Sequence, residues 1–334
     1  MIYAGIDEAG YGPLLGPLCV GTSSFRLRAA PSPEPSSQPS SQPSSPVDLW
    51  RLLASGVCRK PKDARRRIAI ADSKKLKSAG KQPLIHLERG VLAFLGGDIP
   101  TDDAALFARL GVSPAASRAT PWHTDALPLP VAISAAEAAI ARNLVSTALD
   151  RADASLAALG VAALDPPAFN ALYDALGNKA SINLSLVYQA LRAVDLARGD
   201  EDAFVAVDRQ GGRADYREGL AEHLADGRAV RVLAESDERS TYAIGGSGAD
   251  GDGVLVVSFE VEAEERHLPV ALASMAAKYT RELSMRRLNA FFAKHLPDLA
   301  PTAGYVEDGR RFLREVKPIL LAEAIPERGF VRVV

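Results

Sequence analysis

The chain has 334 residues, of which 47% are hydrophobic, and this is enough apolar material to bury a full core. The composition therefore excludes disorder along the whole chain. The formal net charge of −2 does not decide for or against a nucleic-acid partner, because a basic groove can lie on a nearly neutral protein.

Cysteine usage and apolar runs narrow the class of protein further. Cys19 and Cys58 show neither a CxxC nor a Cys/His spacing, so the sequence indicates no zinc site and no disulfide framework. We therefore expect a reducing, cytoplasmic location. No uninterrupted apolar run reaches the length of a membrane span, and the first residues lack a secretory signal pattern, so we expect no membrane partner.

The first predicted element is a short, buried strand. Residues Ile2 to Ile6 are apolar and stop at the acidic pair Asp7 and Glu8, so we expect carboxylates at the tip of this strand. A second strand is predicted over Leu18 to Leu27.

Three segments of loop character follow the first strand. The turn after Glu8 holds Gly10 and Gly12, which can take positive φ and let the backbone approach a ligand closely. Residues 31–46 are almost wholly Pro, Ser, Gln and Glu, which predicts a disordered loop. Residues 59–77 hold the densest basic cluster of the chain, which suits either a solvated face or a nucleic-acid surface.

The middle of the chain, residues 90–181, is rich in alanine and proline. Helical periodicity runs from Ile133 to Leu159, after a loop-like stretch from Pro121 to Pro130. We therefore predict an inserted, mainly helical subdomain.

The C-terminal half alternates helices and strands. An amphipathic helix is predicted over Asn183 to Ala197, and the strand Ala203 to Val207 after it ends at Asp208. Further strands are predicted at residues 228–234 and 254–261.

A long helix is predicted from about Val270 to His295. An apolar stripe runs along it at helical spacing, formed by Leu272, Met275, Tyr279 and Leu283. A separate polar stripe has four-residue spacing and consists of Ser274, Lys278 and Glu282.

The strand-end acids suggest a metal site. Asp7 and Glu8 can be joined at one sheet edge by another strand-end acid such as Asp208, and a cluster of carboxylates is stable when a hard divalent cation sits in it. Oxygen ligands favour Mg²⁺ or Mn²⁺ over zinc. The alternatives are that Asp7, Glu8 and Asp208 are solvated turn or cap residues and that Glu282 is an exposed helix residue.

The residues from Gly5 to Pro17, Gly-Ile-Asp-Glu-Ala-Gly-Tyr-Gly-Pro-Leu-Leu-Gly-Pro, closely resemble the opening motif of ribonuclease HII. Further segments resemble that family in the same order, at residues 71–76, 182–183, 207–208, 273–282 and 304–305. So many ordered matches make a chance resemblance improbable.

The resemblance implies an α/β protein with a ribonuclease H-like fold, in which a central mixed sheet is flanked by helices and followed by helical C-terminal elements. Residues 1–30, 47–89 and 182–334 would form the catalytic domain. Residues 31–46 would be a disordered loop and residues 90–181 an inserted helical region.

The resemblance also implies a two-metal site for Mg²⁺ or Mn²⁺. Asp7, Glu8 and Asp208 match the family's metal-binding acids, and Glu282 stands where the family usually has aspartate. Asp7 would bridge both ions, Glu8 and Asp208 would complete the cage, and Glu282 would hold the ion on the side of the attacking water.

Substrate contacts are implied in the same way. The loop Gly10, Tyr11 and Gly12 stands where the family has glycine-arginine-glycine, and its backbone would meet a ribose 2′-hydroxyl. Tyrosine lacks the forked, charged donors of arginine. Tyr305 matches a tyrosine that stacks on a sugar at the RNA-to-DNA junction, the alternative being a core tyrosine. Other matched positions implied to contact substrate are Ser73, Lys74, Lys75, Asn183, Ser274 and Lys278.

We therefore expect a metal-dependent endonuclease that cleaves the RNA strand of RNA/DNA hybrids, or ribonucleotides embedded in DNA, to 5′-phosphate and 3′-hydroxyl ends. The alternative is a catalytically impaired protein that binds RNA/DNA hybrids. A nucleotide-binding enzyme built on Gly10, Gly12 and Gly16 is a weak third reading, because that spacing is neither a dinucleotide fingerprint nor a P-loop.

Overall fold

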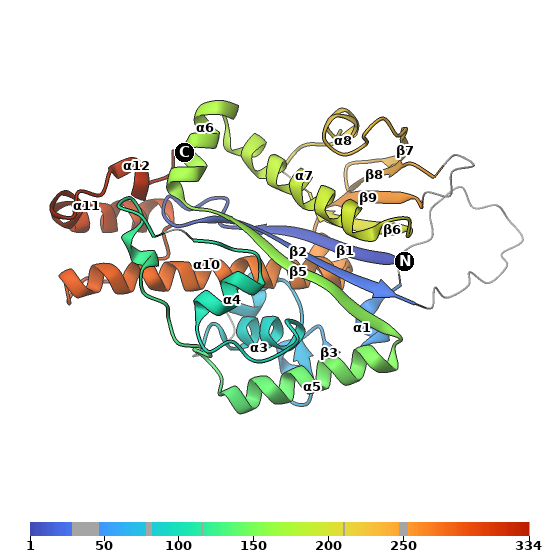
Figure 1. Ribbon diagram of the computed structural model, residues 1–334, viewed down its shortest axis with the longest axis horizontal. Coiled ribbons are helices and arrows are strands. Elements are labelled where there is room, and N and C mark those ends of the chain that lie inside the picture. Colours follow the sequence, from blue (N-terminus) through green and yellow to red (C-terminus); the bar gives the residue numbers. More distant parts are fainter. Residues whose placement is uncertain (29–46, 78–81, 115, 210, 247–252, 334) are drawn as a thin grey trace, which may run out of the picture.

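A seven-stranded mixed sheet runs through the middle of the protein (Figure 1). The computed structural model describes residues 1–28, 47–77, 82–114, 116–209, 211–246 and 253–333. In spatial order the strands are β5 (Ala154–Leu164), β2 (Leu18–Leu27), β1 (Ile2–Ala9), β6 (Ala203–Asp208), β9 (Leu255–Glu260), β8 (Arg239–Ile244) and β7 (Val230–Glu235). Strands β1, β6 and β9 are parallel, and the other pairs are antiparallel. The expected fold class, an α/β protein with a central mixed sheet, is confirmed.

Helices cover both faces of the sheet. The helices α10 (Leu268–His295), α3 (Ile85–Phe94) and α5 (Ala135–Arg151) lie on one face, and α6 (Pro166–Leu176), α7 (Lys179–Arg198) and α8 (Arg217–His223) lie on the other. Each set of helices buries its own apolar cluster against the sheet. No helix in the described parts of the chain is long and apolar enough to span a membrane.

The remaining elements are short or lie at the C-terminal end. They are α1 (Leu49–Leu52), β3 (Val57–Cys58), the 3-10 turn η1 (Pro61–Asp63), β4 (Ile68–Ala69), α2 (Ser73–Lys77), α4 (Asp103–Arg109), the 3-10 turn η2 (Pro121–His123), α9 (Ala263–Arg266), α11 (Val306–Ala322) and α12 (Glu327–Phe330). Helices α11 and α12 are the expected helical C-terminal elements, and they pack against the end of α10 through a separate apolar cluster.

Strand β1 extends beyond the predicted residues. Its apolar side chains are buried on both faces, as in a central strand. The antiparallel ladder with β2 continues to the pair Ala9 and Cys19, so Asp7 and Glu8 lie inside the strand rather than at its tip. The parallel ladder with β6 ends earlier, at Ile6 and Val207, which leaves the acids beyond their parallel neighbour.

The segment 90–181, which we predicted to be an inserted, mainly helical subdomain, is not entirely helical. It contains α4, α5 and α6, but it also supplies β5, which pairs with β2 along its whole length. The boundary at residue 90 falls inside α3. The predicted helix 133–159 ends at Arg151 because Asp153, with φ of 47°, turns the chain into β5.

A buried carboxylate ties this segment to the main core. Glu88 accepts backbone N–H groups from Val131 at 2.6 Å, Ala132 at 2.6 Å and Ile133 at 2.9 Å, and also the Tyr279 hydroxyl at 2.5 Å. Because α10 supplies Tyr279, one side chain of α3 joins residues 131–133 to the central helix. The segment therefore folds as part of the same core.

Other expectations differ in smaller ways. Strand β8 was missed, although β7 and β9 were predicted, and it pairs between them. Helix α7 begins before the predicted Asn183 because the side chain of Asn178 caps it by accepting the Ser181 N–H. The predicted disordered loop 31–46 lies outside the described residues.

Helix α10 lies unusually close to the sheet at two glycines. A Cβ added at Gly5 would lie 2.1 Å from the backbone nitrogen of Val270, and one added at Gly21 would lie 2.1 Å from the carbonyl oxygen of Ala273. No side chain fits in either place, so the helix backbone rests directly on β1 and β2. This contact brings Ser274, the first residue of the polar stripe of α10, to Asp7 of β1.

We predict that Gly21→Ala lowers the free energy of unfolding by roughly 1–3 kcal/mol, because the added methyl must push α10 away from β2. The matched control is Gly212→Ala, where nothing lies within 4 Å of the added Cβ. Urea unfolding followed by circular dichroism measures both. Equal stability of the two variants would contradict the close packing.

Candidate metal centre

Parallel strands bring three carboxylates together. Asp7 follows Ile6 in β1 and Asp208 follows Val207 in β6, and Ile6 and Val207 are register partners. One oxygen each from Asp7, Glu8 and Asp208 lies within 4.8 Å of the others. The three acids that the sequence placed at strand ends therefore meet at one edge of the sheet.

A fourth acid, Glu264 of helix α9, was not predicted from the sequence and lies beside Asp208. Asp208 accepts the backbone N–H of Ala263 at 3.1 Å, and the carboxyl of Glu264 hydrogen-bonds to Asp208. Strand β9 is parallel to β6, so the chain leaving Glu260 reaches this same sheet edge. The available signal was the run of acids directly after a predicted strand.

The electrostatics of the cluster favour its protonated form in the absence of a cation. Burial, followed by the charges of Glu8 and Asp208, raises the pKa of Asp7 well above its usual value. Burial raises the pKa of Asp208 to about 6, against the hydrogen bond from Ala263. Burial and the charge of Asp208 raise the pKa of Glu264 to about 7. Ionised carboxylates are therefore disfavoured here unless a cation offsets their charge.

Helix α10 and helix α2 contribute polar groups beside Asp7. A hydrogen bond from Ser274 to Asp7 opposes the rise in the pKa of that carboxyl. The hydroxyl oxygens of Ser274 and Ser73 lie 2.9 Å apart, within hydrogen-bond distance, and both serines are buried. Partial burial lowers the pKa of Lys74, but the charges of Asp7 and Asp72 outweigh it and raise that pKa.

Glu282, the predicted fourth metal ligand, lies farther along α10. It follows Ser274 by two helical turns, which corresponds to about 12 Å along the axis of α10. Its carboxylate pairs with Lys278 at 3.1 Å, and it is not part of the cluster of Asp7, Glu8 and Asp208. Lys75 is likewise turned to another partner, because its ammonium pairs with Glu265.

The loop after β1 is tied to the loop before α11. The carbonyl of Gly304 accepts the N–H groups of Leu14 at 2.7 Å and Leu15 at 3.1 Å. Tyr305 follows directly and is 54% exposed, so it is not a core tyrosine. Gly10 has φ of +88°, a conformation that glycine adopts readily.

A cavity of about 540 Å³ opens beside Glu8, on the side of the sheet that α7 covers. It is lined by Glu8, Tyr11, Ala180, Asn183, Gly211, Gly212 and Arg213. Tyr11 and Asn183 were predicted from the sequence as substrate contacts, whereas Arg213 was not.

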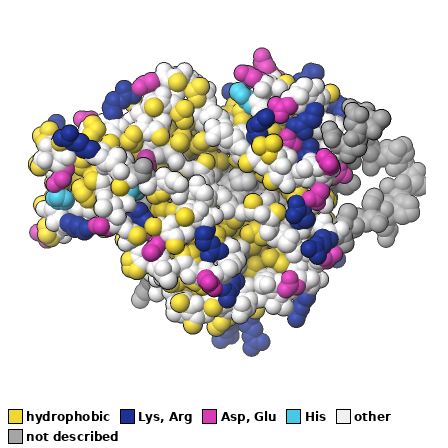
Figure 2. Space-filling model, viewed as in Figure 1, with side chains coloured by type: hydrophobic (Ala, Val, Ile, Leu, Met, Phe, Trp, Pro, Cys, Tyr) yellow, Lys and Arg dark blue, Asp and Glu magenta, His cyan; other side chains and the backbone are white. Residues whose placement is uncertain are grey.

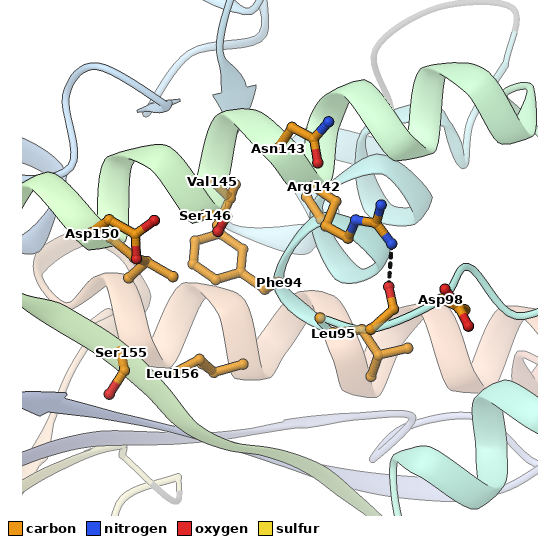
Figure 3. A pocket seen from close by; sticks show the side chains of 14 residues that line it. Phe94, Leu95, Asp98, Arg142, Asn143, Val145, Ser146, Asp150, Ser155 and Leu156 are labelled. Atoms are coloured by element: carbon orange, nitrogen blue, oxygen red, sulfur yellow. Dashed lines mark hydrogen bonds between the residues drawn. The ribbon is translucent and has the colours of Figure 1, made fainter.

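A second cavity, of about 530 Å³, lies between α5 and β5, and Figure 3 shows the Phe94 ring within it. Arg142 at its wall donates to the backbone carbonyl of Gly97. None of the predicted site residues lines it. On the face seen in Figure 2, acidic and basic side chains are interspersed rather than gathered in one patch.

Comparison with known proteins found no matching family model and no matching curated sequence. Solved structures do resemble the chain. Ribonuclease HII from Archaeoglobus fulgidus, solved in a complex with PCNA, is 18% identical, with a TM-score of 0.41 over 100% of this chain and 94% of that one. Ribonuclease H2 from Pyrococcus horikoshii is 15% identical, with a TM-score of 0.44 over 99% and 92%. Aquifex aeolicus ribonuclease H3 is 16% identical, with a TM-score of 0.37 over 99% and 71%.

All three likenesses are distant.

We predict that the metal-free protein loses stability as the pH rises from about 4 to about 7. Asp208 and Glu264 have ordinary pKa values of 3.8 and 4.5, and their folded values are about 6 and about 7. In this window the unfolded chain loses protons that the folded state still holds, so the free energy of unfolding falls with pH. Urea unfolding in EDTA across this range measures the slope.

The control is Asp208→Asn, which removes one carboxyl and should flatten the slope. Adding Mg²⁺ or Mn²⁺ above pH 7 should restore stability to the parent, because a bound cation offsets the repulsion. Identical slopes for the parent and Asp208→Asn would contradict the charge assignment.

Proposed function

We propose that this protein is a metal-dependent endonuclease that hydrolyses the RNA strand of RNA/DNA hybrids or ribonucleotides embedded in DNA. The expected products carry 5′-phosphate and 3′-hydroxyl ends. The observation that carries the proposal is the group of Asp7, Glu8 and Asp208, whose ligand oxygens lie within 4.8 Å of one another. The resemblance of residues 5–17 to ribonuclease HII supplies the substrate class.

The residues fit Mg²⁺ or Mn²⁺. The donors are carboxylate oxygens, which suit these hard cations, and burial together with neighbouring acids raises the pKa values of Asp7 and Asp208, an effect that a bound cation would oppose. Asp7, Glu8, Asp208 and Glu264 would hold the ions. When bound, such ions supply Lewis acidity, which lowers the pKa of an attacking water and stabilises the leaving 3′-oxygen.

The protein's own side chains position these acids. The hydrogen bond from Ser274 orients Asp7, the Ala263 N–H orients Asp208, and Glu264 is bonded to Asp208. Lys74 stands beside the acids as a cation that can meet a substrate phosphate. Ser73 is buried and lies within hydrogen-bond distance of Ser274, so it would position the Ser274 hydroxyl rather than contact substrate itself.

Substrate recognition would come from the loops around the acids. The backbone of Gly12 is suited to approach a ribose 2′-hydroxyl, since an added Cβ there meets nothing within 4 Å, whereas Gly10 packs against the Pro17 carbonyl oxygen and the Arg281 side chain. The exposed Tyr305 ring is available to stack on a sugar. We also propose Asn183, Lys75 and Lys278 as substrate contacts. Asn183 lines the cavity beside Glu8, whereas Lys75 is paired with Glu265 and Lys278 with Glu282.

The alternative function is binding of RNA/DNA hybrids without efficient cleavage, which the presence of Tyr11 in the first loop favours. The cluster of acids argues against it. Negative charge repels phosphate unless a cation is bound, so a protein that only binds nucleic acid gains nothing from it.

We expect Asp7→Asn to reduce cleavage by at least a thousandfold, because the variant loses a ligand at the centre of the cluster. Binding of the hybrid should be retained. The assay uses end-labelled duplexes with one ribonucleotide, a short ribonucleotide run, a full RNA strand or no RNA, in Mg²⁺ or Mn²⁺. Normal cleavage by Asp7→Asn would refute the site, and binding without cleavage by the parent would support the alternative.

We expect Glu264→Gln to reduce cleavage by about a hundredfold or more, and Glu282→Gln to change it by less than about tenfold. The physical reason is that Glu264 is bonded to Asp208 whereas Glu282 pairs with Lys278. The two substitutions are chemically identical, so each is the control for the other. A larger loss of cleavage in Glu282→Gln than in Glu264→Gln would show that Glu282, and not Glu264, is the fourth metal ligand.

A further inference from the structure

The cavity beside Glu8 is built from three separate parts of the chain. The end of β1 and its loop supply Glu8 and Tyr11, the first turns of α7 supply Ala180 and Asn183, and the loop after β6 supplies Gly211 to Arg213. Glu8 lies in this wall and is also a member of the acidic cluster. The cavity and the candidate metal centre therefore share Glu8 and lie next to each other.

Lys179, a cation beside the cavity, contacts the ring of Tyr11, which lines it. The ammonium of Lys179 lies 4.9 Å from the centre of the Tyr11 ring, which is a cation–π distance. Both side chains are partly exposed, so each retains a surface for a ligand. The contact holds the ring of Tyr11 against the first turn of α7.

A second cation stands across the cavity. The backbone of Arg213 is held in place because its carbonyl accepts from the Arg209 side chain at 2.8 Å and from the Tyr216 hydroxyl at 3.1 Å. The Arg213 residue itself is exposed and lines the cavity. A guanidinium on a fixed backbone is well suited to bind a phosphate with paired donors.

Electrostatics explain why cations are needed here. A nucleic-acid strand that crosses Asp7, Glu8 and Asp208 meets negative charge, and its neighbouring phosphates need cations on either side. Lys74 is on the side of α2 and α10, whereas Lys179 and Arg213 are on the side of α7. Together they would flank the acids.

We propose that the cavity beside Glu8 binds one nucleotide of the cleaved strand next to the cut, with its sugar or base on the Tyr11 ring and its phosphate between Lys179 and Arg213. This inference rests on the proposed nuclease function. Stacking on a ring accepts any base, so the subsite holds the strand without sequence preference. In this chain Lys179 and Arg213 provide the phosphate contacts that Tyr11 cannot.

The test measures hybrid binding without cleavage. Fluorescence anisotropy of a labelled RNA/DNA hybrid is recorded with Asp7→Asn protein in Mg²⁺ over a range of salt concentrations. Lys179→Ala and Arg213→Ala, each added to this parent, should weaken binding about three- to tenfold and reduce the salt slope by about one each. The double variant should reduce the slope by about two.

Controls separate charge, stacking and folding. Arg151→Ala removes an exposed cation from α5, on the opposite side of the sheet, and should leave affinity and slope unchanged. Tyr11→Phe should bind as the parent does, whereas Tyr11→Ala should bind roughly tenfold more weakly with the same salt slope. Thermal unfolding of every variant should match that of the parent.

The outcomes distinguish this inference from the function on which it rests. If the parent binds the hybrid and the Lys179 and Arg213 variants match it in affinity and slope, the subsite is refuted and the nuclease proposal stands. If the parent neither binds nor, with Asp7 restored, cleaves the hybrid, both proposals fall. Full competition by micromolar adenosine monophosphate would assign the cavity to a free nucleotide and overturn its role as a strand subsite.

Discussion

The direct contact between the backbone of α10 and strands β1 and β2 is the constraint on which the site depends. Gly5 and Gly21 leave no room for side chains, so Val270 and Ala273 lie on the sheet itself. This contact sets the height of α10 above β1 and therefore places Ser274 beside Asp7. A larger residue at either glycine would move the helix and the hydrogen bond together.

The same helix organises the loops at the open end of the sheet. Arg281 is buried and donates to the carbonyl of Leu15 at 3.1 Å and to that of Ala303 at 3.0 Å. These bonds join the loop after β1 to the loop before α11, which the Gly304 carbonyl also links. Burial lowers the pKa of Arg281 because the charged guanidinium loses its hydration. Its hydrogen bonds to the two carbonyls offset part of that cost. The Arg281 side chain thus links the loop after β1 to the loop that precedes Tyr305.

The acids themselves oppose folding in the absence of a cation. Their raised pKa values show that the folded state disfavours several negative charges at one sheet edge. Proteins tolerate such local conflicts at functional sites, where the surrounding structure enforces them. Here the enforcing structure is the pair of parallel strands β1 and β6, whose register brings Asp7 level with Asp208. The concentration of charge is what makes the edge suited to a divalent ion.

The sequence by itself determined the elements whose signal is local. Apolar runs located β1 and β2, helical spacing located α10, and the acids Asp7, Glu8 and Asp208 were recognisable because each follows an apolar run. These patterns depend on neighbours only a few residues apart, which a single sequence displays directly.

Only the tertiary structure decided which distant residues meet. Residues 154–164 are mostly alanine and leucine, which favour a helix. They form β5 instead because their backbone pairs with that of β2. Glu264 lies beside Asp208 because β9 is parallel to β6. Glu282 lies two helical turns beyond Ser274 along α10. Strand pairing and helix placement are long-range contacts, and local periodicity carries no information about them.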